Sequence, residues 1–310
     1  MNPMHLSSMT RPKSILVATD LKDLDFLLPV AIDQARMTGA MIWLLHVTPH
    51  ASIESGAYPL VETEKEFRTA EAALAKVALE LREKNLACAY EVRRSYPVDE
   101  IKDCIREHGI DRLIVGTTSR GKLGKLLIGS VAEELIRSLE IPVCTVGPHF
   151  MPRPHNNPRR IVFALSLRHH PDHSLGFAVD LAAASRAELI VLHVTEQDRL
   201  NEGIDAGTRP KLDELLRGVQ HMDLVPHIRI RSGEPAEEIV AECTALGPEL
   251  LVLSAFPASP LGARFRAGVA YRVIAQAPCP TFTLCSGSKT KRNGNYREFS
   301  EVQIGSSYSG

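Results

Sequence analysis

The residues best suited to chemistry lie in two short segments, each following an apolar run. The first is Thr19-Asp20, which puts a carboxylate directly after the run 14–19. The second is a glycine-rich basic loop that ends where a helix is predicted to begin; it contains Gly116, Thr117, Ser119, Arg120, Gly129, Ser130 and Val131. Glycines let a backbone approach a phosphate closely, and a helix N-terminus attracts anions. The pattern favours a phosphate-binding site with an acidic group beside it.

The second segment has two other interpretations: a helix cap that binds no ligand, and a P-loop. Ser130-x-x-Glu133 fits a capping box, in which the serine caps the helix by itself. Residues 116–122 also copy most of a P-loop, but Leu123 stands where a Ser or Thr would hold Mg²⁺. The P-loop is therefore disfavoured, whereas the capping box and the phosphate site stay open. No arrangement of residues predicts a catalytic nucleophile.

Short apolar runs alternate with longer amphipathic stretches, which is typical of successive βαβ units on a parallel sheet. The first half predicts five strands, over 14–19, 41–47, 87–93, 111–116 and 143–147. Helices are predicted between them over 26–39, 63–85, 98–108 and 130–139. We expect an α/β domain with a five-stranded parallel sheet and helices on both faces. Ligands of such sheets bind beyond the carboxyl ends of the strands, which is where both segments lie.

The sequence also repeats itself. Residues 41–48 (MIWLLHVT) match 188–195 (ELIVLHVT) at an offset of 147, and 109–116 match 247–254 at an offset of 138. We infer a tandem duplication with a proline-rich linker, 151–160, between the copies. The predicted units are a first domain over 1–150, a second domain over 158–286 and a disordered polar tail over 287–310.

The second copy lacks the phosphate-site residues. Its first strand ends in Leu165-Ser166-Leu167, without an acid at the Asp20 position. The residues that replace Gly116, Ser119, Gly129 and Ser130 are Ser254, Pro257, Ala267 and Gly268. Because proline has no N–H to offer a phosphate, we expect at most one site per chain, within residues 14–147.

Composition limits the partners. The 36 Lys and Arg balance the 37 Asp and Glu, so the chain has no overall charge with which to attract nucleic acid. No run reaches 18 apolar residues, and the N-terminus has no signal-peptide core. We therefore expect a cytoplasmic protein that binds neither nucleic acid nor membrane. The six cysteines have no paired spacing, and we expect buried thiols rather than disulfides or a metal site.

The histidines predict no metal site either. His46 and His193 occupy equivalent places in the second strand of each copy, and we expect both to be structural. The cluster over 169–173 lies in a loop and lacks the i, i+4 spacing of ligands on a helix.

These motifs resemble universal stress proteins, a family of Rossmann-like (adenine nucleotide alpha hydrolase-like) domains. Nucleotide-binding members carry Gly-x2-Gly-x9-Gly-Ser/Thr after the fourth strand and an Asp at the end of the first. Here the loop reads Gly116-x2-Ser119-x9-Gly129-Ser130, and Asp20 ends the first strand. The resemblance covers both copies, nearly all of 12–285. Ser119 departs from the pattern, since it stands where the family has its second glycine. Its Cβ crowds the backbone if that position needs a positive φ.

The resemblance implies that the first domain binds ATP or a related adenine nucleotide, with or without Mg²⁺. Asp20 would lie near the adenine and ribose, and Val47 and Val115 would line the base pocket. The ribose and phosphates would be surrounded by Gly116, Ser119, Gly129, Ser130 and Val131. The sequence itself adds three candidates to this set: Thr19 and Thr117 by their position at the strand ends, and Arg120 as a basic neighbour of the phosphates.

The resemblance also implies how the domains associate and what the protein does. The last strands of the two domains would pair as an intramolecular pseudo-dimer, and a homodimer is a further option. The implied role is regulation in the stress response without efficient catalysis. The alternatives are a scaffold of the same fold that binds no nucleotide, and a slow ATPase.

Overall fold

The computed structural model of the protein describes residues 10–48, 60–117, 128–152, 158–167, 172–195, 204–219, 224–255 and 268–285. Three of the sequence predictions lie outside these residues: the disordered tail, the site residues Ser119 and Arg120, and most of the histidine cluster over 169–173. Within the described part of the chain, no helix is both long and apolar enough to cross a membrane.

The first copy forms a parallel sheet in the predicted manner. Its strands are β1 (Ser14–Ala18), β2 (Met41–Thr48), β3 (Cys88–Arg94), β4 (Arg112–Gly116) and β5 (Val143–Val146). Its helices are α2 (Leu24–Thr38), α3 (Leu60–Glu83), α4 (Pro97–Glu107) and α5 (Ser130–Ser138). The strand order is β3-β2-β1-β4-β5, so the direction of winding reverses between β1 and β4.

The second copy repeats this arrangement. Its strands are β6 (Arg160–Leu165), β7 (Glu188–Thr195), β8 (His227–Ser232), β9 (Leu250–Ala255) and β10 (Thr281–Cys285). Its helices are α6 (Asp172–Ser185), α7 (Ile204–Arg217), α8 (Pro235–Leu246) and α9 (Val269–Gln276). The order β10-β9-β6-β7-β8 is that of the first copy, with β6 and β9 in the places of β1 and β4.

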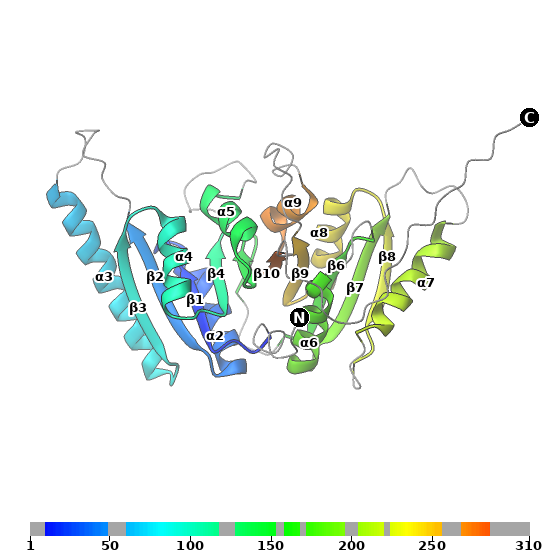
Figure 1. The fold of residues 1–310 in the computed structure, drawn as a ribbon, viewed down its shortest axis with the longest axis horizontal. Coiled ribbons are helices and arrows are strands. Elements are labelled where there is room, and N and C mark those ends of the chain that lie inside the picture. The colour runs from blue at the N-terminus through cyan, green and yellow to red at the C-terminus, as the bar shows by residue number, and fades with distance from the viewer. Residues whose placement is uncertain are drawn as a thin grey trace, which may run out of the picture.

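The two sheets join through their last strands, which confirms the predicted intramolecular pairing. β5 and β10 run antiparallel, with Cys144 level with Phe282, and the result is one ten-stranded sheet (Figure 1). Each last strand therefore covers the hydrogen-bonding edge of the other. A homodimer of whole chains has to use another surface.

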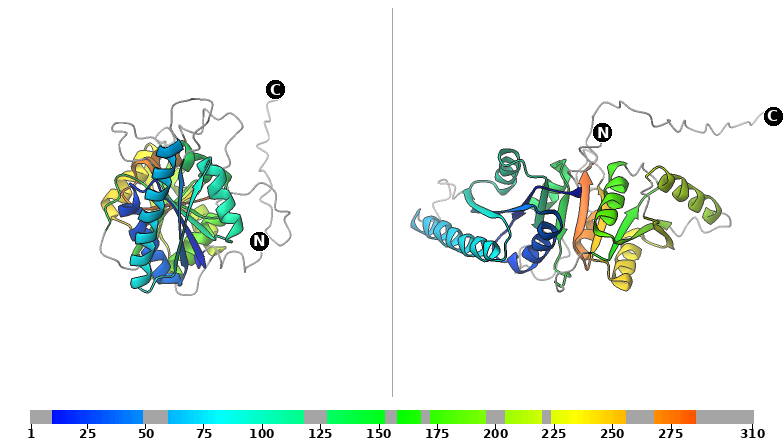
Figure 2. Two further views of the ribbon diagram at one scale, coloured as in Figure 1. Left: turned by 90° about the vertical axis from the view of Figure 1, so that its left-hand side faces the viewer. Right: turned by 90° about the horizontal axis from the view of Figure 1, so that it is seen from below.

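Helices cover both faces of this sheet (Figure 2). Residues of β1 alternate between two buried apolar clusters: Ile15 and Val17 pack in the cluster below α2 and α3, and Leu16 and Ala18 pack in the cluster below α4 and α5. The period-two alternation is why both faces of an apolar strand are filled. Five of the six cysteines, Cys88, Cys104, Cys144, Cys243 and Cys279, are buried free thiols, as expected.

Candidate functional site

The site predicted from the sequence lies where the strand order of the first copy reverses. β1 and β4 are parallel neighbours, and Ala18 is level with Val115. Thr19-Asp20 and Gly116-Thr117 therefore leave the sheet side by side at its carboxyl edge. A crevice beyond such a reversal is the usual ligand position in open α/β sheets.

The turn between β1 and α2 is tightly tied. The Thr19 hydroxyl donates to Asp23 Oδ1 at 2.5 Å and accepts from the backbone N–H of Leu21 at 2.9 Å. Asp20 Oδ1 accepts from the N–H of Lys22 at 2.9 Å. Leu21 has a φ of 70°, in the left-handed region that L-residues adopt only at a cost. These bonds offset that cost and hold two carboxyl groups at the sheet edge.

Asp23 is a site residue that the sequence reasoning missed. Its pKa is raised from 3.8 to about 6, mainly by burial and also by the negative charge of Asp20, while the hydrogen bond from Thr19 acts in the opposite direction. A Cβ on Gly116 would lie 2.7 Å from Asp23 Oδ2, so the carboxyl group occupies the space over that glycine. The available signal was a second acid three residues after Asp20, in a loop rather than on a helix.

The start of α5 is fastened to the end of β4. The N–H of Gly129 donates to the carbonyl of Thr117 at 2.6 Å, and a Cβ on Gly129 would meet the same oxygen at 3.3 Å. Gly129 is the N-cap residue, and its carbonyl accepts the first bond of the helix from Glu133. Ser130 is therefore the first helical residue, which makes the capping-box interpretation wrong: a capping box needs the serine one position earlier.

This start leaves hydrogen-bond donors beside the strand ends. The first N–H groups of any helix, here from Ser130 onward, have no acceptor within the helix, and the Ser130 side chain is exposed. Thr117 is 2 % exposed, and its hydroxyl has no hydrogen-bond partner in the described structure. This hydroxyl lies on the side of Gly147, so it is a buried neighbour of the site rather than an open donor. An anionic ligand with hydroxyl or phosphate oxygens suits the N–H groups at the start of α5.

The three valines named from the sequence lie on one apolar face. Val115 is buried in the cluster below α4 and α5, and Val47 and Val131 are partly buried against the same cluster. Val115 is thus mainly a core residue, whereas the other two retain exposed surface. His46, next to Val47, uses Nδ1 to donate to the carbonyl of Thr19 at 2.8 Å. It braces the end of β1.

The second copy keeps the backbone of the site and loses its side chains. His193 donates from Nδ1 to the carbonyl of Leu165 at 2.9 Å, which matches the bond between His46 and Thr19. Gly268 aligns with Ser130 in the sequence, but it is the N-cap residue of α9 and has nearly the same backbone angles as Gly129, so α9 begins one residue later than α5. The first strand of the second copy, β6, is followed by Ser166 and Leu167 instead of an acid.

Comparison with known proteins agrees with this architecture. The family model for the universal stress protein family matches residues 12–147 and again residues 157–284. The two matches cover most of the chain, and the protein belongs to the universal stress protein family.

Individual relatives extend the comparison. A universal stress protein of Methanocaldococcus jannaschii is 29% identical over 139 residues, which are 43% of this chain and 81% of the relative. The crystal structure of a universal stress protein from Archaeoglobus fulgidus matches with a TM-score of 0.70 and 19% identity, covering 89% of this chain and 99% of that one. A putative universal stress protein from Pseudomonas aeruginosa matches with a TM-score of 0.64 and 20% identity, over 90% and 95% of the two chains. These structural likenesses show the fold, with two α/β domains in one chain.

Proposed function

We propose that the first domain binds ATP or a related adenine nucleotide, and that occupancy of this site regulates the protein rather than serving efficient catalysis. One observation carries the proposal: the acidic turn after β1 and the open start of α5 are held together at the reversal of strand order. Site and donor set fit a ligand that has hydroxyl groups at one end and anionic oxygens at the other.

Each part of the site has a role in this proposal. Asp20 accepts hydrogen bonds from the ribose or the adenine, and Val47 and Val131 offer apolar surface to the base. The N–H groups at the start of α5 and the Ser130 hydroxyl hold phosphate oxygens. Carboxylate oxygens are ligands that Mg²⁺ accepts, so Asp20 would also serve a nucleotide bound with that ion. Ser119 and Arg120 stay predictions of phosphate contacts.

The limited catalysis follows from what the neighbouring groups already do. His46 is bonded through Nδ1 to a backbone carbonyl, and Asp23 is bonded to the Thr19 hydroxyl. Both are fixed in structural positions, whereas a general base has to reach the proton that it takes. Binding that shifts the conformation or association of the protein needs no such group.

Isothermal titration of the full chain with ATP and Mg²⁺ tests the proposal. We expect one nucleotide per chain, and about tenfold weaker binding for Asp20→Ala and for Ser130→Ala, which corresponds to roughly 1.4 kcal/mol each. Ser138→Ala, an exposed serine at the other end of α5, is the matched control and should bind like the wild type.

Two other outcomes would decide for the alternatives. A chain that gives no heat at high micromolar ATP, and carries no nucleotide by mass spectrometry after purification, would be a scaffold without this ligand. Turnover of ATP that falls in both site variants would make the protein a slow ATPase at this site. Turnover that neither variant changes would reject the site as its source.

A further inference from the structure

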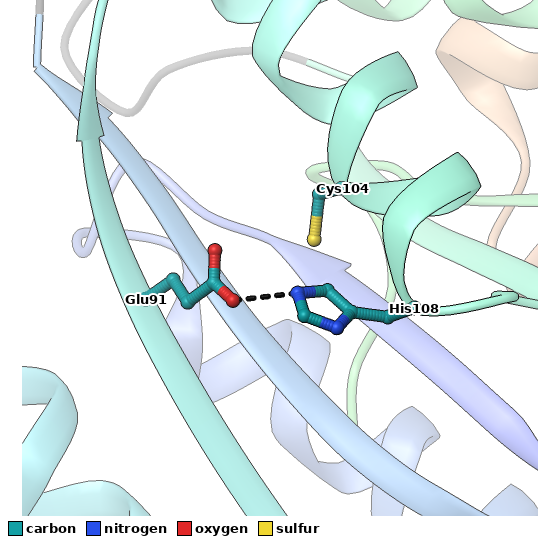
Figure 3. A group of neighbouring side chains, drawn as sticks. All are labelled: Glu91, Cys104 and His108. Atoms are coloured by element: carbon teal, nitrogen blue, oxygen red, sulfur yellow. Dashed lines mark hydrogen bonds and ion pairs between the residues drawn. The ribbon is translucent and has the colours of Figure 1, made fainter.

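A cluster of three different metal-ligating side chains lies away from the nucleotide site, between β3 and α4. Glu91 projects from β3 and Cys104 from α4, and His108 is the C-cap residue directly after α4 (Figure 3). One carboxylate oxygen, the thiol sulfur and one imidazole nitrogen all lie within 4.8 Å of one another. None of the three was proposed as a ligand from the sequence.

The fold holds all three side chains in place. Cys104 and His108 are four residues apart, so they project from the same face of one helix. The imidazole of His108 stacks on the ring of Trp43, with centroids 3.8 Å apart, and its Nε2 lies 2.6 Å from Glu91 Oε1. Glu91 is level with the buried Leu45 of β2, on the face of the sheet that α4 covers.

The charges around the cluster favour a cation. Arg93 donates to Glu91 Oε2 and to Glu107 Oε2, both at 2.6 Å, and lies 3.5 Å from Glu100 Oε2. Three carboxylates therefore share one guanidinium, so negative charge exceeds positive charge among these four side chains. Because Arg93 engages Oε2 of Glu91, the other oxygen stays directed at His108. A divalent cation would balance this charge.

The second copy shows what fills the same place when no metal can bind. At the offset of 138, Glu91 and Cys104 correspond to Arg229 and Glu242, and His108 corresponds to Leu246. Arg229 and Glu242 form an ion pair of 2.7 Å between β8 and α8. The second copy thus carries its own cation between strand and helix, whereas the first copy has an acid at the position of that arginine.

We propose that Glu91, Cys104 and His108 bind Zn²⁺. A thiolate, an imidazole and a carboxylate are a ligand set that Zn²⁺ accepts in tetrahedral geometry, with the soft sulfur disfavouring Mg²⁺ and Ca²⁺. Bonds of about 2.0–2.3 Å place tetrahedral ligands roughly 3.3–3.8 Å apart, so the three side chains close in by about 1 Å. Water supplies the fourth ligand, since the Glu91 and His108 side chains are about a quarter exposed.

Binding changes the state of one ligand. Burial raises the pKa of the Cys104 thiol to about 12, against the opposing effect of Arg93, so the metal-free thiol keeps its proton. Zn²⁺ displaces that proton to solvent when it binds the sulfur. The hydrogen bond between Glu91 and His108 is exchanged for two bonds to the metal, which then joins β3 to the end of α4.

Metal titration of the reduced full chain tests the site. After treatment with a chelator, the protein is titrated with Zn²⁺ in competition with a chromophoric chelator, and with Co²⁺ as a spectroscopic probe. We expect one Zn²⁺ per chain, tetrahedral Co²⁺ absorption with a thiolate charge-transfer band, and no binding of Mg²⁺ at the same concentration. Glu91→Gln and His108→Gln should each weaken Zn²⁺ binding at least about tenfold, and Cys104→Ser should abolish the charge-transfer band.

Matched controls separate this site from adventitious binding. His149→Gln removes an exposed histidine, and Cys243→Ser removes a buried thiol of the second copy; both should keep one Zn²⁺ per chain. The proposal is overturned if the wild type retains no Zn²⁺ after dialysis, or if Glu91→Gln and His108→Gln bind it as tightly as the wild type. These two variants decide the matter even if Cys104→Ser fails to fold. None of the measurements depends on nucleotide binding.

Discussion

Asp23 offers the sharpest test of the turn that carries the proposed nucleotide site. Its pKa rises from 3.8 in the unfolded chain to about 6 in the fold, so folding favours the protonated acid. The stabilising effect of this proton is complete below about pH 4 and is lost as the pH rises toward 6. At 1.36 kcal/mol per pKa unit the full difference is about 3 kcal/mol. Salt screens the repulsion from Asp20, so we expect about 1–3 kcal/mol.

The variant Asp23→Asn removes the charge and keeps an oxygen that accepts the Thr19 hydroxyl. We expect it to be about 1–3 kcal/mol more stable than the wild type at pH 7 and nearly equal to it at pH 4, measured by urea denaturation across this range. Asp25→Asn, which changes an exposed acid in the first turn of α2, is the control and should bring no gain. A difference between Asp23→Asn and wild type that is absent at pH 7, or that does not change with pH, would refute the reasoning.

Three further substitutions test the packing around the site and the junction. Gly116→Ala places a methyl group against the Asp23 carboxyl group and should lower the free energy of unfolding by about 1–3 kcal/mol in urea denaturation. The same substitution in the Asp23→Asn variant should lower it by a similar amount, because asparagine has the same shape as aspartate. Phe282→Ala empties a fully buried site in β10 and should cost about 3–5 kcal/mol in the same assay. Tyr271→Phe deletes the bond from the tyrosine hydroxyl to the carbonyl of Glu133 and should cost about 1 kcal/mol, with faster amide exchange at the start of α5 as the local readout.

The fold could be predicted because its signals are periodic and repeated. Apolar runs of strand length separated by amphipathic helices define a parallel α/β sheet whatever the details of the loops. The matches between the two halves then predicted that β7 occupies the same place in the second copy as β2 does in the first, and the strand order confirms this. The pairing of β5 with β10 came from the family resemblance instead, since an apolar strand does not specify its antiparallel partner.

The positions of the candidate site residues were predictable only next to the end of a strand or the start of a helix. Thr19 and Asp20 follow β1, Gly116 ends β4, and Gly129 precedes α5. Asp23 could not be placed, because its position over Gly116 depends on the left-handed conformation of Leu21. A shift of one residue was enough to make the capping box wrong, since the N-cap of α5 is Gly129.

The cluster of Glu91, Cys104 and His108 was still harder to predict from the sequence than Asp23. The spacing of Cys104 and His108 is visible in the sequence, but two potential ligands on a helix are common. The third ligand, Glu91, precedes Cys104 by thirteen residues and lies on a strand. It qualifies only because the fold brings its side chain beside those of Cys104 and His108 (Figure 3). Long-range packing of this kind leaves no local pattern.

The comparison between the copies explains why the two could diverge. Each copy needs its apolar faces to form the sheet, and both retain them: Leu45 and Leu192 are equally buried at equivalent places. The residues at the strand ends and over β3 and β8 are not needed for that core. An acid follows β1 but not β6, and Glu91 faces the end of α4 where Arg229 pairs with α8. Because β10 already covers the edge of β5, the second copy stabilises the first without any ligand, and the polar chemistry could be concentrated in one half of the chain.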